Sequence, residues 1–327
     1  MTDGPATEGD SWVPSACVDI MLPAYGNDAL VRETIESVLT QRDPRWRLTV
    51  VDDGRHLAPG AAGDLESWLT DLSDPRTRYL ANPARLGLNR NFQRCVDEAS
   101  ADLVMLIGAD DRLLPDVVGR VHAAAAAHPD APFVHTGATV IDERGNPALP
   151  LADRVKRLTA VRFDAAQRAR GWQLSGGEVL ASSLLRGNWM YFPSVVFRRD
   201  VLQRHGFRDG YDIVLDLDLY LRILLAGGQA VLFSEPGIEY RRHAASLSSA
   251  TADDGSRFAE EHAYFAEMAA AMTEAGWPKA ARAARTHLTS RLHAVTKTPG
   301  LLAARQWRPA ASMLRAALAS TPPPHQK

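Results

Sequence analysis

An apolar run ends in two adjacent carboxylates in the segment Leu103-Val-Met-Leu-Ile-Gly-Ala-Asp-Asp111. A continuous apolar run of this length is typical of a strand that is buried on both faces. Asp110 and Asp111 would then stand at the carboxyl end of that strand, where open α/β sheets bind their ligands. Because two like charges repel each other, the pair predicts a divalent cation nearby. The alternative is a solvated acidic turn.

The chain on the amino-terminal side of this segment alternates predicted strands with predicted helices. Apolar runs predict strands over Cys17–Leu22, which Pro23 is expected to end, Arg47–Val51 and Thr77–Leu80. Apolar stripes predict helices over about Ala29–Gln41, Gly63–Leu72 and Arg90–Ala99, and a further helix follows from Pro115 to about His128. This alternation predicts an α/β fold of the Rossmann-like type, with a mostly parallel central sheet flanked by helices.

A second pair of carboxylates, Asp52 and Asp53, follows the predicted strand Arg47–Val51. The carboxyl ends of parallel strands meet at one edge of a sheet, so both pairs of carboxylates are expected at the same edge. This agreement favours a ligand site more strongly than either pair does alone.

The second half of the chain is less regular. We expect strands over Phe133–Ile141 and Gln229–Phe233, and helices over Gly177–Leu185, Asp200–Arg204 and Asp216–Ala226. The charged segment Leu151–Gly171 is interpreted as an excursion over the active face. From Arg257 onward the chain is rich in alanine and predicted to be helical.

Composition divides the chain into a flexible tail (residues 1–16), a main domain (17–250) and a basic helical extension (251–327). After Glu274 no acidic residue occurs, so the cations of the extension are uncompensated: Lys279, Arg282, Arg285, Arg291, Lys297, Arg305, Arg308 and Arg315. Its apolar residues among these cations leave two interpretations. The extension docks against the acidic part of the chain or a second subunit, or it contacts an anionic membrane.

The overall composition excludes several classes of protein. A net charge of −2 gives no reason to expect a nucleic-acid partner. Only Cys17 and Cys95 are present, which speaks against a disulfide framework and for a reducing compartment. Met1–Pro14 is polar, and no long apolar span occurs. We therefore expect a cytoplasmic protein, with peripheral contact at the inner face of the membrane as the alternative that the basic extension allows.

Five motifs occur in a fixed order between about Val18 and Ser249 and together resemble glycosyltransferase family 2: Leu22-Pro-Ala-Tyr-Gly-Asn27, Val50-Val-Asp-Asp-Gly54, Gly108-Ala-Asp-Asp111, Asp216-Leu-Asp-Leu-Tyr-Leu-Arg222 and Tyr240-Arg-Arg-His243. The resemblance implies the GT-A fold, with residues 17–130 binding the nucleotide sugar and 131–250 the acceptor. It also implies sugar transfer from a nucleotide-diphosphate donor to an acceptor hydroxyl, usually with inversion and with Mn²⁺ or Mg²⁺. The acceptor would be a glycan, a lipid-linked molecule or a small molecule.

The resemblance also implies roles for residues on the donor side. Asp53, or as the alternative Asp52, would accept the imide hydrogen of a uracil or thymine base, which favours a UDP- or dTDP-sugar. The nucleotide slot would be lined by Pro23, Ala24 and Tyr25, and a phosphate or the ribose would be met by Arg85.

By the same resemblance, the pair Asp110 and Asp111 would lie at the diphosphate of the donor. Asp111 is the expected metal ligand, in the place of the family's DXD motif, and Asp110 would meet the ribose or the metal-bound waters. His243 is a second candidate metal ligand.

Asp216 is the expected general base, at the start of a predicted helix, and Asp218 is its rival. Asn188, Trp189 and Arg241 are expected on the acceptor side.

Three positions depart from the family's pattern: Gly108, Leu215 and Leu217 replace two acids and an aromatic residue. They keep open the alternative of a catalytically inactive nucleotide-sugar-binding or scaffolding protein. A sugar nucleotidyltransferase is disfavoured, because Pro23–Asn27 lacks a glycine-rich phosphate loop.

Overall fold

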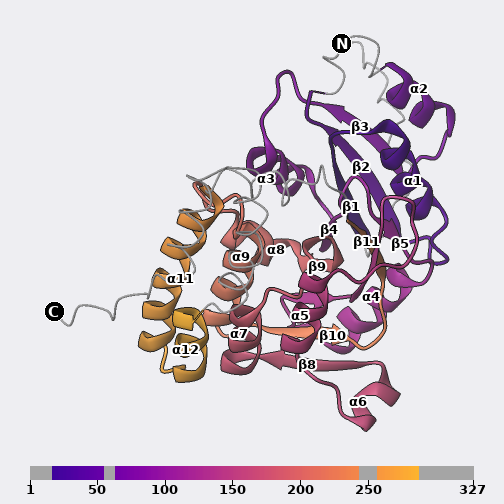
Figure 1. Cartoon of the computed structure of the whole chain (residues 1–327). Coiled ribbons are helices and arrows are strands. Elements are labelled where there is room, and N and C mark those ends of the chain that lie inside the picture. Colours follow the sequence, from indigo (N-terminus) through magenta and orange to yellow (C-terminus); the bar gives the residue numbers. More distant parts are fainter. Residues whose placement is uncertain (1–16, 55–62, 243–255, 287–327) are drawn as a thin grey trace, which may run out of the picture.

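The computed structural model describes residues 17–54, 63–242 and 256–286 (Figure 1). Within these residues eight strands form one sheet in the order β3-β2-β1-β4-β9-β6-β10-β8. Only β8 and β9 run antiparallel to their neighbours, so the predicted mostly parallel sheet is confirmed. The strands are β1 (Val18–Ala24), β2 (Trp46–Asp52), β3 (Thr77–Ala81), β4 (Leu103–Leu106), β6 (Phe133–His135), β8 (Trp172–Gly176), β9 (Val195–Arg198) and β10 (Gln229–Phe233).

The helices of the first half follow the predicted alternation closely. They are α1 (Asp28–Leu39), α2 (Gly63–Asp71), α3 (Leu88–Glu98) and α4 (Val117–Ala127). Asn27 caps α1, because its side chain accepts a hydrogen bond from the backbone N–H of Ala29. Pro23 does not end the first strand as expected: β1 continues to Ala24, since Pro23 still pairs with Val51 of β2. Pairing with β4 extends only to Met21, so the missing N–H of Pro23 costs no hydrogen bond there.

The expected single strand over Phe133–Ile141 is wrong, because the chain turns at Gly137 and divides it. Gly137 has a φ of 71°, a backbone conformation that glycine adopts most easily. The second piece, β7 (Ala138–Ile141), joins β5 (Arg112–Leu113) and β11 (Ile238–Arg241) in a separate sheet of order β5-β11-β7. This small sheet brings the segment after Asp111 beside the segment of Arg241.

Two hydrophobic cores lie on opposite faces of the large sheet. Alternate side chains of β1 and β4 point to opposite faces: Ile20 and Met105 face α1, α2 and α4, whereas Met21 and Val104 face the other core. That second core includes α3, α7 (Gly177–Arg186), α9 (Leu215–Leu225), α11 (Ser256–Glu274) and α12 (Pro278–Thr286). The sheet is therefore covered on both faces, as its apolar strands predict.

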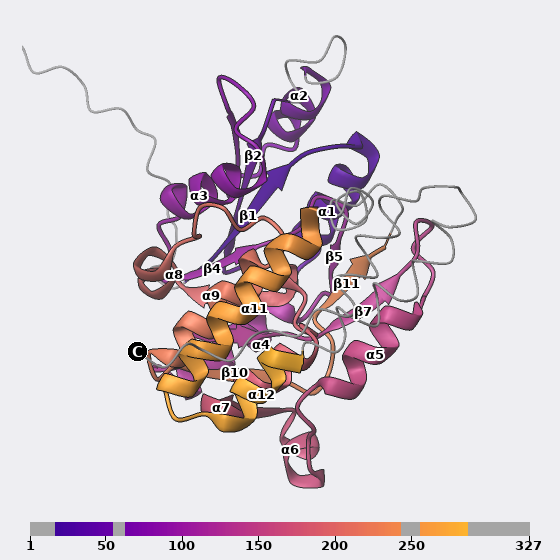
Figure 2. The ribbon, with the colours of Figure 1, turned by 60° about the vertical axis from the view of Figure 1, so that its left-hand side comes forward.

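The described part of the carboxy-terminal extension packs against the rest of the chain. Tyr264 and Met272 of α11 are buried in the core that α7 and α9 share, and α12 buries Ala280 and Ala284 there. Figure 2 shows α11 lying across α9, with α12 beside α7. Every described helix is too short or too polar to cross a lipid bilayer. The apolar and basic residues from 287 onward, and the predicted tail 1–16, lie outside the described residues.

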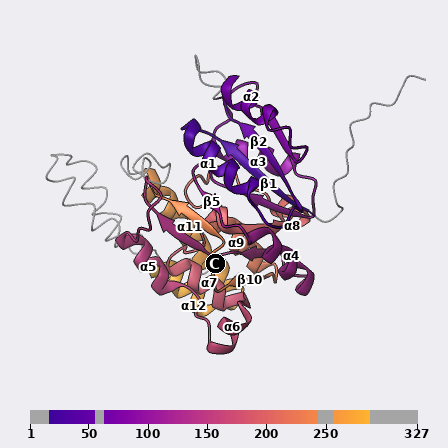
Figure 3. The same ribbon diagram turned by 90° about the vertical axis from the view of Figure 1, so that its right-hand side faces the viewer.

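The remaining helices connect the later strands. They are α5 (Leu151–Thr159), α6 (Ala165–Arg170) and α8 (Arg199–His205), with a 3₁₀ turn at Phe192–Ser194. α5 and α6 fall in the charged segment Leu151–Gly171, and Figure 3 shows α5 at the periphery, away from α4.

Candidate active site

The carboxyl ends of four neighbouring strands bring the predicted donor residues to one edge of the sheet. Ala24 at the end of β1 pairs with Asp52 at the end of β2, and Asp52 pairs with Ala81 of β3. On the other side of β1, the backbone N–H of Ile107 donates to the carbonyl of Met21. The loops that carry Tyr25, Asp53, Arg85 and the Asp110-Asp111 pair therefore leave the sheet side by side.

Asp53 is buried and organises the loop after β3. Its Oδ1 accepts from the backbone N–H of Leu86 at 2.6 Å and from Nδ2 of Asn82 at 2.9 Å, and its Oδ2 accepts from the backbone N–H of Gly87 at 2.9 Å. Asn82 also donates to Asn91 of α3. A carboxylate offers about four lone pairs. Asp53 thus retains capacity for a further donor at Oδ2.

The other donor-side residues take different positions at this edge. Asp52 is fully buried and accepts a short hydrogen bond from the hydroxyl of Tyr79. The side chain of Ala24 is buried too, so Ala24 would meet a ligand through its backbone. Tyr25 is exposed. Arg85 donates a hydrogen bond to the hydroxyl of Tyr25 at 2.9 Å, and the guanidinium of Arg85 lies 4.7 Å from the centroid of the Tyr25 ring. Tyr25 and Arg85 therefore form one contact at the edge of the site.

Asp111 is buried with one carboxylate oxygen unsatisfied. Its backbone carbonyl accepts from the hydroxyl of Thr34 at 2.7 Å, and its Oδ1 accepts from the backbone N–H of Arg241 at 2.8 Å. Its Oδ2 is buried and has no hydrogen-bond partner among the described residues. Burial, and secondarily the charge of Asp110, raise the pKa of Asp111 well above its ordinary value.

Gly108 is required by the packing of this carboxylate. A Cβ atom at position 108 would overlap Oδ2 of Asp111 and would lie 3.3 Å from Oδ1 of Asp110. An acid cannot replace Gly108 unless Asp111 moves. The loop is therefore built for two carboxylates rather than three.

The orphaned oxygen of Asp111 fits a hard cation such as Mg²⁺ or Mn²⁺. Among the described residues no cluster of three or more His, Cys, Asp or Glu side chains surrounds a common point. Mg²⁺ commonly binds one or two carboxylates, with waters and substrate phosphates as its other ligands. Asp111 fits such a role as one protein ligand. His243, the second predicted ligand, lies outside the described residues.

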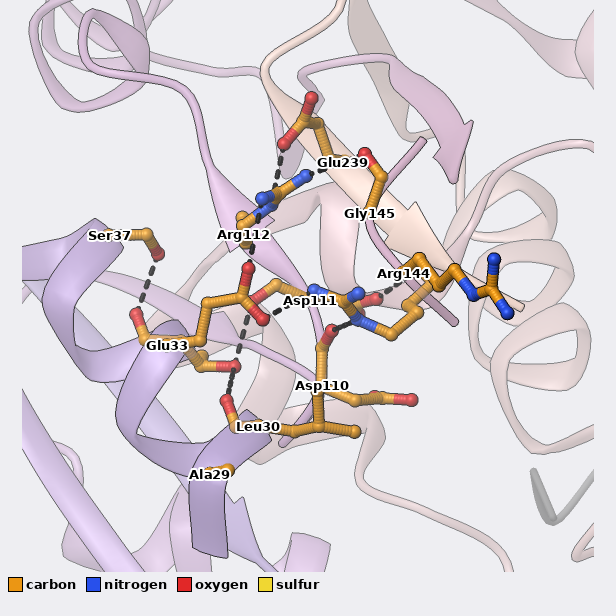
Figure 4. Close-up of polar contacts among 12 residues, drawn as sticks. Ala29, Leu30, Glu33, Ser37, Asp110, Asp111, Arg112, Arg144, Gly145 and Glu239 are labelled. Carbon is orange, nitrogen blue, oxygen red and sulfur yellow. Dashed lines mark hydrogen bonds and ion pairs between the residues drawn. The ribbon is translucent and has the colours of Figure 1, made fainter. Parts of the chain in front are cut away.

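Arg241 is buried and holds the Asp110-Asp111 turn in place. Its Nε donates to the backbone carbonyl of Asp110 at 2.8 Å, and its Nη2 donates to Glu33 of α1 at 2.6 Å. Glu33 also binds Arg112 at 2.9 Å, and Arg112 binds Glu239 at 2.7 Å. Figure 4 shows this cluster, with the carboxylate of Asp110 directed away from Glu33 and Arg112. Arg241, expected on the acceptor side, therefore contacts the acidic turn.

Asp216 lies in the first turn of α9 and is held by Asn188. Nδ2 of Asn188 donates to Oδ2 of Asp216 at 2.8 Å, and the backbone N–H of Leu217 donates to Oδ1 at 2.7 Å. Burial raises the pKa of Asp216 above its ordinary value. Asp216, the predicted base, and Asn188, a predicted acceptor-side residue, lie 28 positions apart in the sequence and are in direct contact in the structure.

Trp189 lies next to Asn188 and is partly buried. Its Nε1 donates to Ser183 of α7 at 2.9 Å, and its ring lies 5.1 Å edge-on from His135. Burial lowers the pKa of His135 to about 3, and neither ring nitrogen has a hydrogen-bond partner among the described residues.

Asp218 faces the opposite side of α9 from Asp216. Two arginines neutralise it: Arg222 at 2.8 Å and Arg208 at 3.1 Å. Its carboxylate is almost completely buried. Residues two positions apart on a helix point about 200° apart, so the two acids occupy different environments.

A further charged group is formed by two residues of α5, Asp153 and Lys156, which the sequence analysis did not single out, together with Tyr191 and Arg242. Oδ1 of buried Asp153 on α5 accepts from the hydroxyl of Tyr191 at 2.6 Å and from Arg242 at 2.9 Å. The ammonium of Lys156 lies 5.0 Å from the ring centroid of Tyr191. Burial raises the pKa of Asp153, but Arg242, Tyr191 and Lys156 outweigh it, so the pKa lies below its ordinary value.

The charges of this group also influence the two candidate site acids. The positive charge of Arg242 acts on Asp111 as well as on Asp153, and the charge of Lys156 acts on Asp153 and on Asp216. The charged character of Leu151–Gly171 was the only signal in the sequence for the two α5 residues. No pattern in the sequence marked Glu33 as part of the site, because its partners, Arg112 and Arg241, are distant from it in the sequence.

The fold is similar to that of solved structures. Staphylococcus aureus TarS, residues 1–349, in its complex with UDP-GlcNAc, superposes with a TM-score of 0.60 at 12% identity, over 92% of this chain and 81% of that one. Its complex with UDP superposes with a TM-score of 0.58 at 11% identity, over the same shares of the two chains. The predicted GT-A fold is confirmed.

Sequence comparison identifies the family. The sequence model described as Glycosyl transferase family 2 matches residues 19–182, which is half of the chain. The chain belongs to this family of glycosyltransferases. The uncharacterized protein MT1568 of Mycobacterium tuberculosis is 28% identical over 246 residues, 71% of this chain and 69% of that protein. An N-acetylglucosaminyltransferase of Mesorhizobium japonicum is 28% identical over 124 residues, 37% of this chain and 28% of that protein.

Proposed function

We propose that this protein transfers a sugar from a nucleotide-diphosphate donor to an acceptor hydroxyl by a single inverting displacement. The observation that carries the proposal is the state of two acids: Asp111 is buried with an orphaned oxygen, and Asp216, partly buried in the first turn of α9, has a raised pKa. The positive charges of Arg242 and Lys156 act on Asp111 and on Asp216 respectively. The acceptor class stays open among glycans, lipid-linked molecules and small molecules.

Asp216 is proposed as the general base. A base with a raised pKa is a stronger proton acceptor than an ordinary aspartate. Asn188 fixes the orientation of one oxygen, so the carboxylate can receive the acceptor proton in a defined direction. Asp218 is not a suitable base, because Arg208 binds one of its carboxylate oxygens and Arg222 binds the other.

The donor is proposed to be a UDP- or dTDP-sugar. The remaining lone pair of Asp53 Oδ2 is suited to the imide N–H of uracil or thymine. The UDP-GlcNAc and UDP complexes of the structurally similar TarS support this choice. Tyr25 and Arg85, which bind each other at the edge, would separate or rotate together to admit the nucleotide.

Asp111 is proposed to hold Mn²⁺ or Mg²⁺, with His243 as a further candidate ligand. Such an ion, when bound, neutralises the charge that develops on the leaving diphosphate. Asp111 offers the ion its Oδ2, which has no hydrogen-bond partner among the described residues. The backbone N–H of Arg241 donates to Oδ1 and so fixes the orientation of the carboxyl group.

A two-part experiment tests this proposal. Thermal shifts with UDP-GlcNAc and other UDP- and dTDP-sugars, each with Mn²⁺ or with EDTA, would identify the donor, since a ligand of the folded state raises stability. Release of UDP is then measured for the wild type, for Asp216→Asn and for the control Asp200→Asn, an exposed acid on α8. We expect Asp216→Asn to keep the thermal shift and lose turnover, and Asp200→Asn to keep both.

The alternative of an inactive nucleotide-sugar-binding or scaffolding protein makes a different prediction. It requires a donor-dependent thermal shift without any UDP release by the wild type, with every acceptor tried. The absence of both the shift and the release would contradict the proposed function and this alternative together.

A further inference from the structure

Helix α5 has two faces with different chemistry. Asp153 and Lys156, three residues apart, lie on the face toward the site, where Asp153 binds Arg242 and Tyr191. At the end of the helix, the hydroxyl of Thr159 donates to the carbonyl of Gly187 at 3.1 Å. Leu151, Arg154 and Leu158, spaced by three and four residues, lie on the other face.

This outer face exposes large apolar side chains. Among the described residues seven large hydrophobic side chains are exposed, and three of them fall within Leu149–Leu158: Leu149 at 42%, Leu151 at 63% and Leu158 at 76%. Single exposed leucines are ordinary on protein surfaces, whereas a group of them on one element indicates an interaction surface. We call Leu149, Leu151, Leu158, Arg154 and Arg157 the α5 surface.

The charge of the α5 surface is positive. Arg154 and Arg157 are exposed, and the single acid of the helix, Asp153, is buried and paired with Arg242. No acidic side chain of α5 therefore compensates these two arginines. Exposed leucines beside uncompensated arginines are the two kinds of side chain with which a protein surface binds an anionic membrane, through apolar contact with the lipid and through attraction to its negative charge.

We propose that the α5 surface docks this protein on an anionic lipid membrane, with Leu151 and Leu158 in the headgroup region and Arg154 and Arg157 on lipid phosphates. A second copy of the chain fits this surface less well. A two-fold contact through α5 would bring Arg154 and Arg157 close to the same arginines of the other copy, and like charges repel. A soluble anion would not use the leucines.

Docking through α5 would place the active site next to the membrane. The inner face of the same helix carries Asp153 and Lys156, whose charges act on Arg242 and Asp216. Figure 3 shows α5 at the periphery of the molecule, and the side chains of Leu151 and Leu158 are exposed there. The inference does not depend on the proposed reaction, because membrane binding is measured without a sugar donor.

Co-sedimentation of the full chain with vesicles tests the proposal. Vesicles of phosphatidylcholine alone are compared with vesicles that also contain phosphatidylglycerol, at low and at high salt. We expect binding to the anionic vesicles that weakens with salt. Arg154→Gln/Arg157→Gln should weaken it about five-fold for each arginine, and Leu151→Ser/Leu158→Ser should weaken it about ten-fold or more.

Matched controls are available elsewhere on the surface. Val179→Ser removes an equally exposed apolar side chain from α7, and Arg90→Gln/Arg186→Gln removes two exposed arginines from α3 and α7. Both controls should bind like the wild type, and all variants should keep the wild-type melting temperature.

Three results would overturn the proposal. The wild type could fail to bind anionic vesicles, or the α5 variants could bind as well as the controls, which would assign binding to another segment. A wild-type dimer that the leucine variant dissociates would instead assign the α5 surface to a second copy.

Discussion

Arg241 of β11 donates a hydrogen bond from Nη2 to Oε2 of Glu33 on α1 at 2.6 Å, across 208 positions of sequence. The same guanidinium binds the carbonyl of Asp110, and the backbone N–H of Arg241 binds Asp111. Arg241 is almost fully buried, and Glu33 compensates its buried positive charge. The geometry of the acidic turn is therefore set by a helix and a strand from opposite ends of the domain.

Glu33→Gln should weaken metal binding without direct contact between Glu33 and the metal. The variant leaves the buried guanidinium of Arg241 without its carboxylate, which is expected to cost about 1–3 kcal/mol of stability, since Glu33 is partly exposed. We expect Mn²⁺ affinity, measured by thermal shift, to fall about three- to ten-fold. Glu36→Gln, an exposed acid on the same helix, is the control and should change neither quantity.

Asp111→Asn should stabilise the metal-free protein and remove its response to Mn²⁺. The wild type holds a buried carboxyl group whose Oδ2 has no partner among the described residues and whose pKa is raised by burial. Such a group favours the unfolded state at every pH above its ordinary pKa. Replacing it should raise stability by about 1–2 kcal/mol, or a few degrees in melting temperature. A destabilised variant that still responds to Mn²⁺ would contradict the assignment.

The first half of the fold could be predicted because its signals are local. The apolar runs of β1, β2 and β4 are continuous, and the carboxylates follow them directly in the sequence. The division of Phe133–Ile141 into β6 and β7 was not predicted, because the sequence on both sides of Gly137 is largely apolar and β7 is separated from β6 only by its long-range pairing with β11. β8 was missed because its sequence, Trp-Gln-Leu-Ser-Gly, contains no apolar run.

The candidate site shows the same limit. The sequence left both Asp216 and Asp218 as candidates for the general base. Helical periodicity predicts that they point to different sides of the helix, but it does not predict which of the two carboxylates is paired with arginines. That depends on Arg208, which comes from the loop before α9, and on the packing of α11. Asp153 and Glu33 act only through partners that are distant in sequence, so no local pattern marks them.

Asp218→Asn should lose stability, in contrast to Asp216→Asn. Asp218 is buried between Arg222 and Arg208, so its neutralisation leaves two cations without their carboxylate. We expect a loss of about 2–4 kcal/mol in urea unfolding, less than for a fully buried pair because Arg208 is partly exposed and also binds Glu267.

Asp216→Asn has no such pair to break and should lose about 10²- to 10⁴-fold in turnover at nearly unchanged stability. The reverse pattern, with turnover lost only in Asp218→Asn, would assign the base to Asp218.

Asp153→Asn should reduce turnover more than donor binding. The variant removes the charge that holds Arg242 and Tyr191 between the acidic turn and Lys156. Tyr191→Phe, which removes only one of these hydrogen bonds, should have a smaller effect, about 1 kcal/mol or less. Kinetics with the donor that the thermal shifts identify would separate kcat from KM for both variants. Equal losses in the two variants would contradict a role for the Asp153 charge.

His135→Phe should make the protein more resistant to acid. The wild-type imidazole is buried without a partner, and its pKa in the folded state is lowered to about 3. The unfolded chain takes up this proton near pH 6.5, so the wild type loses stability as the pH falls from there toward 3, by about 1.4 kcal/mol for each pH unit. Phenylalanine keeps an aromatic ring against Trp189 and binds no proton. Urea unfolding at pH about 7.5 and about 4.5 should therefore show the variant losing about 2–3 kcal/mol less than the wild type between the two conditions. A constant difference between the two proteins at both pH values would mean that His135 is protonated in the folded state as readily as in the unfolded chain.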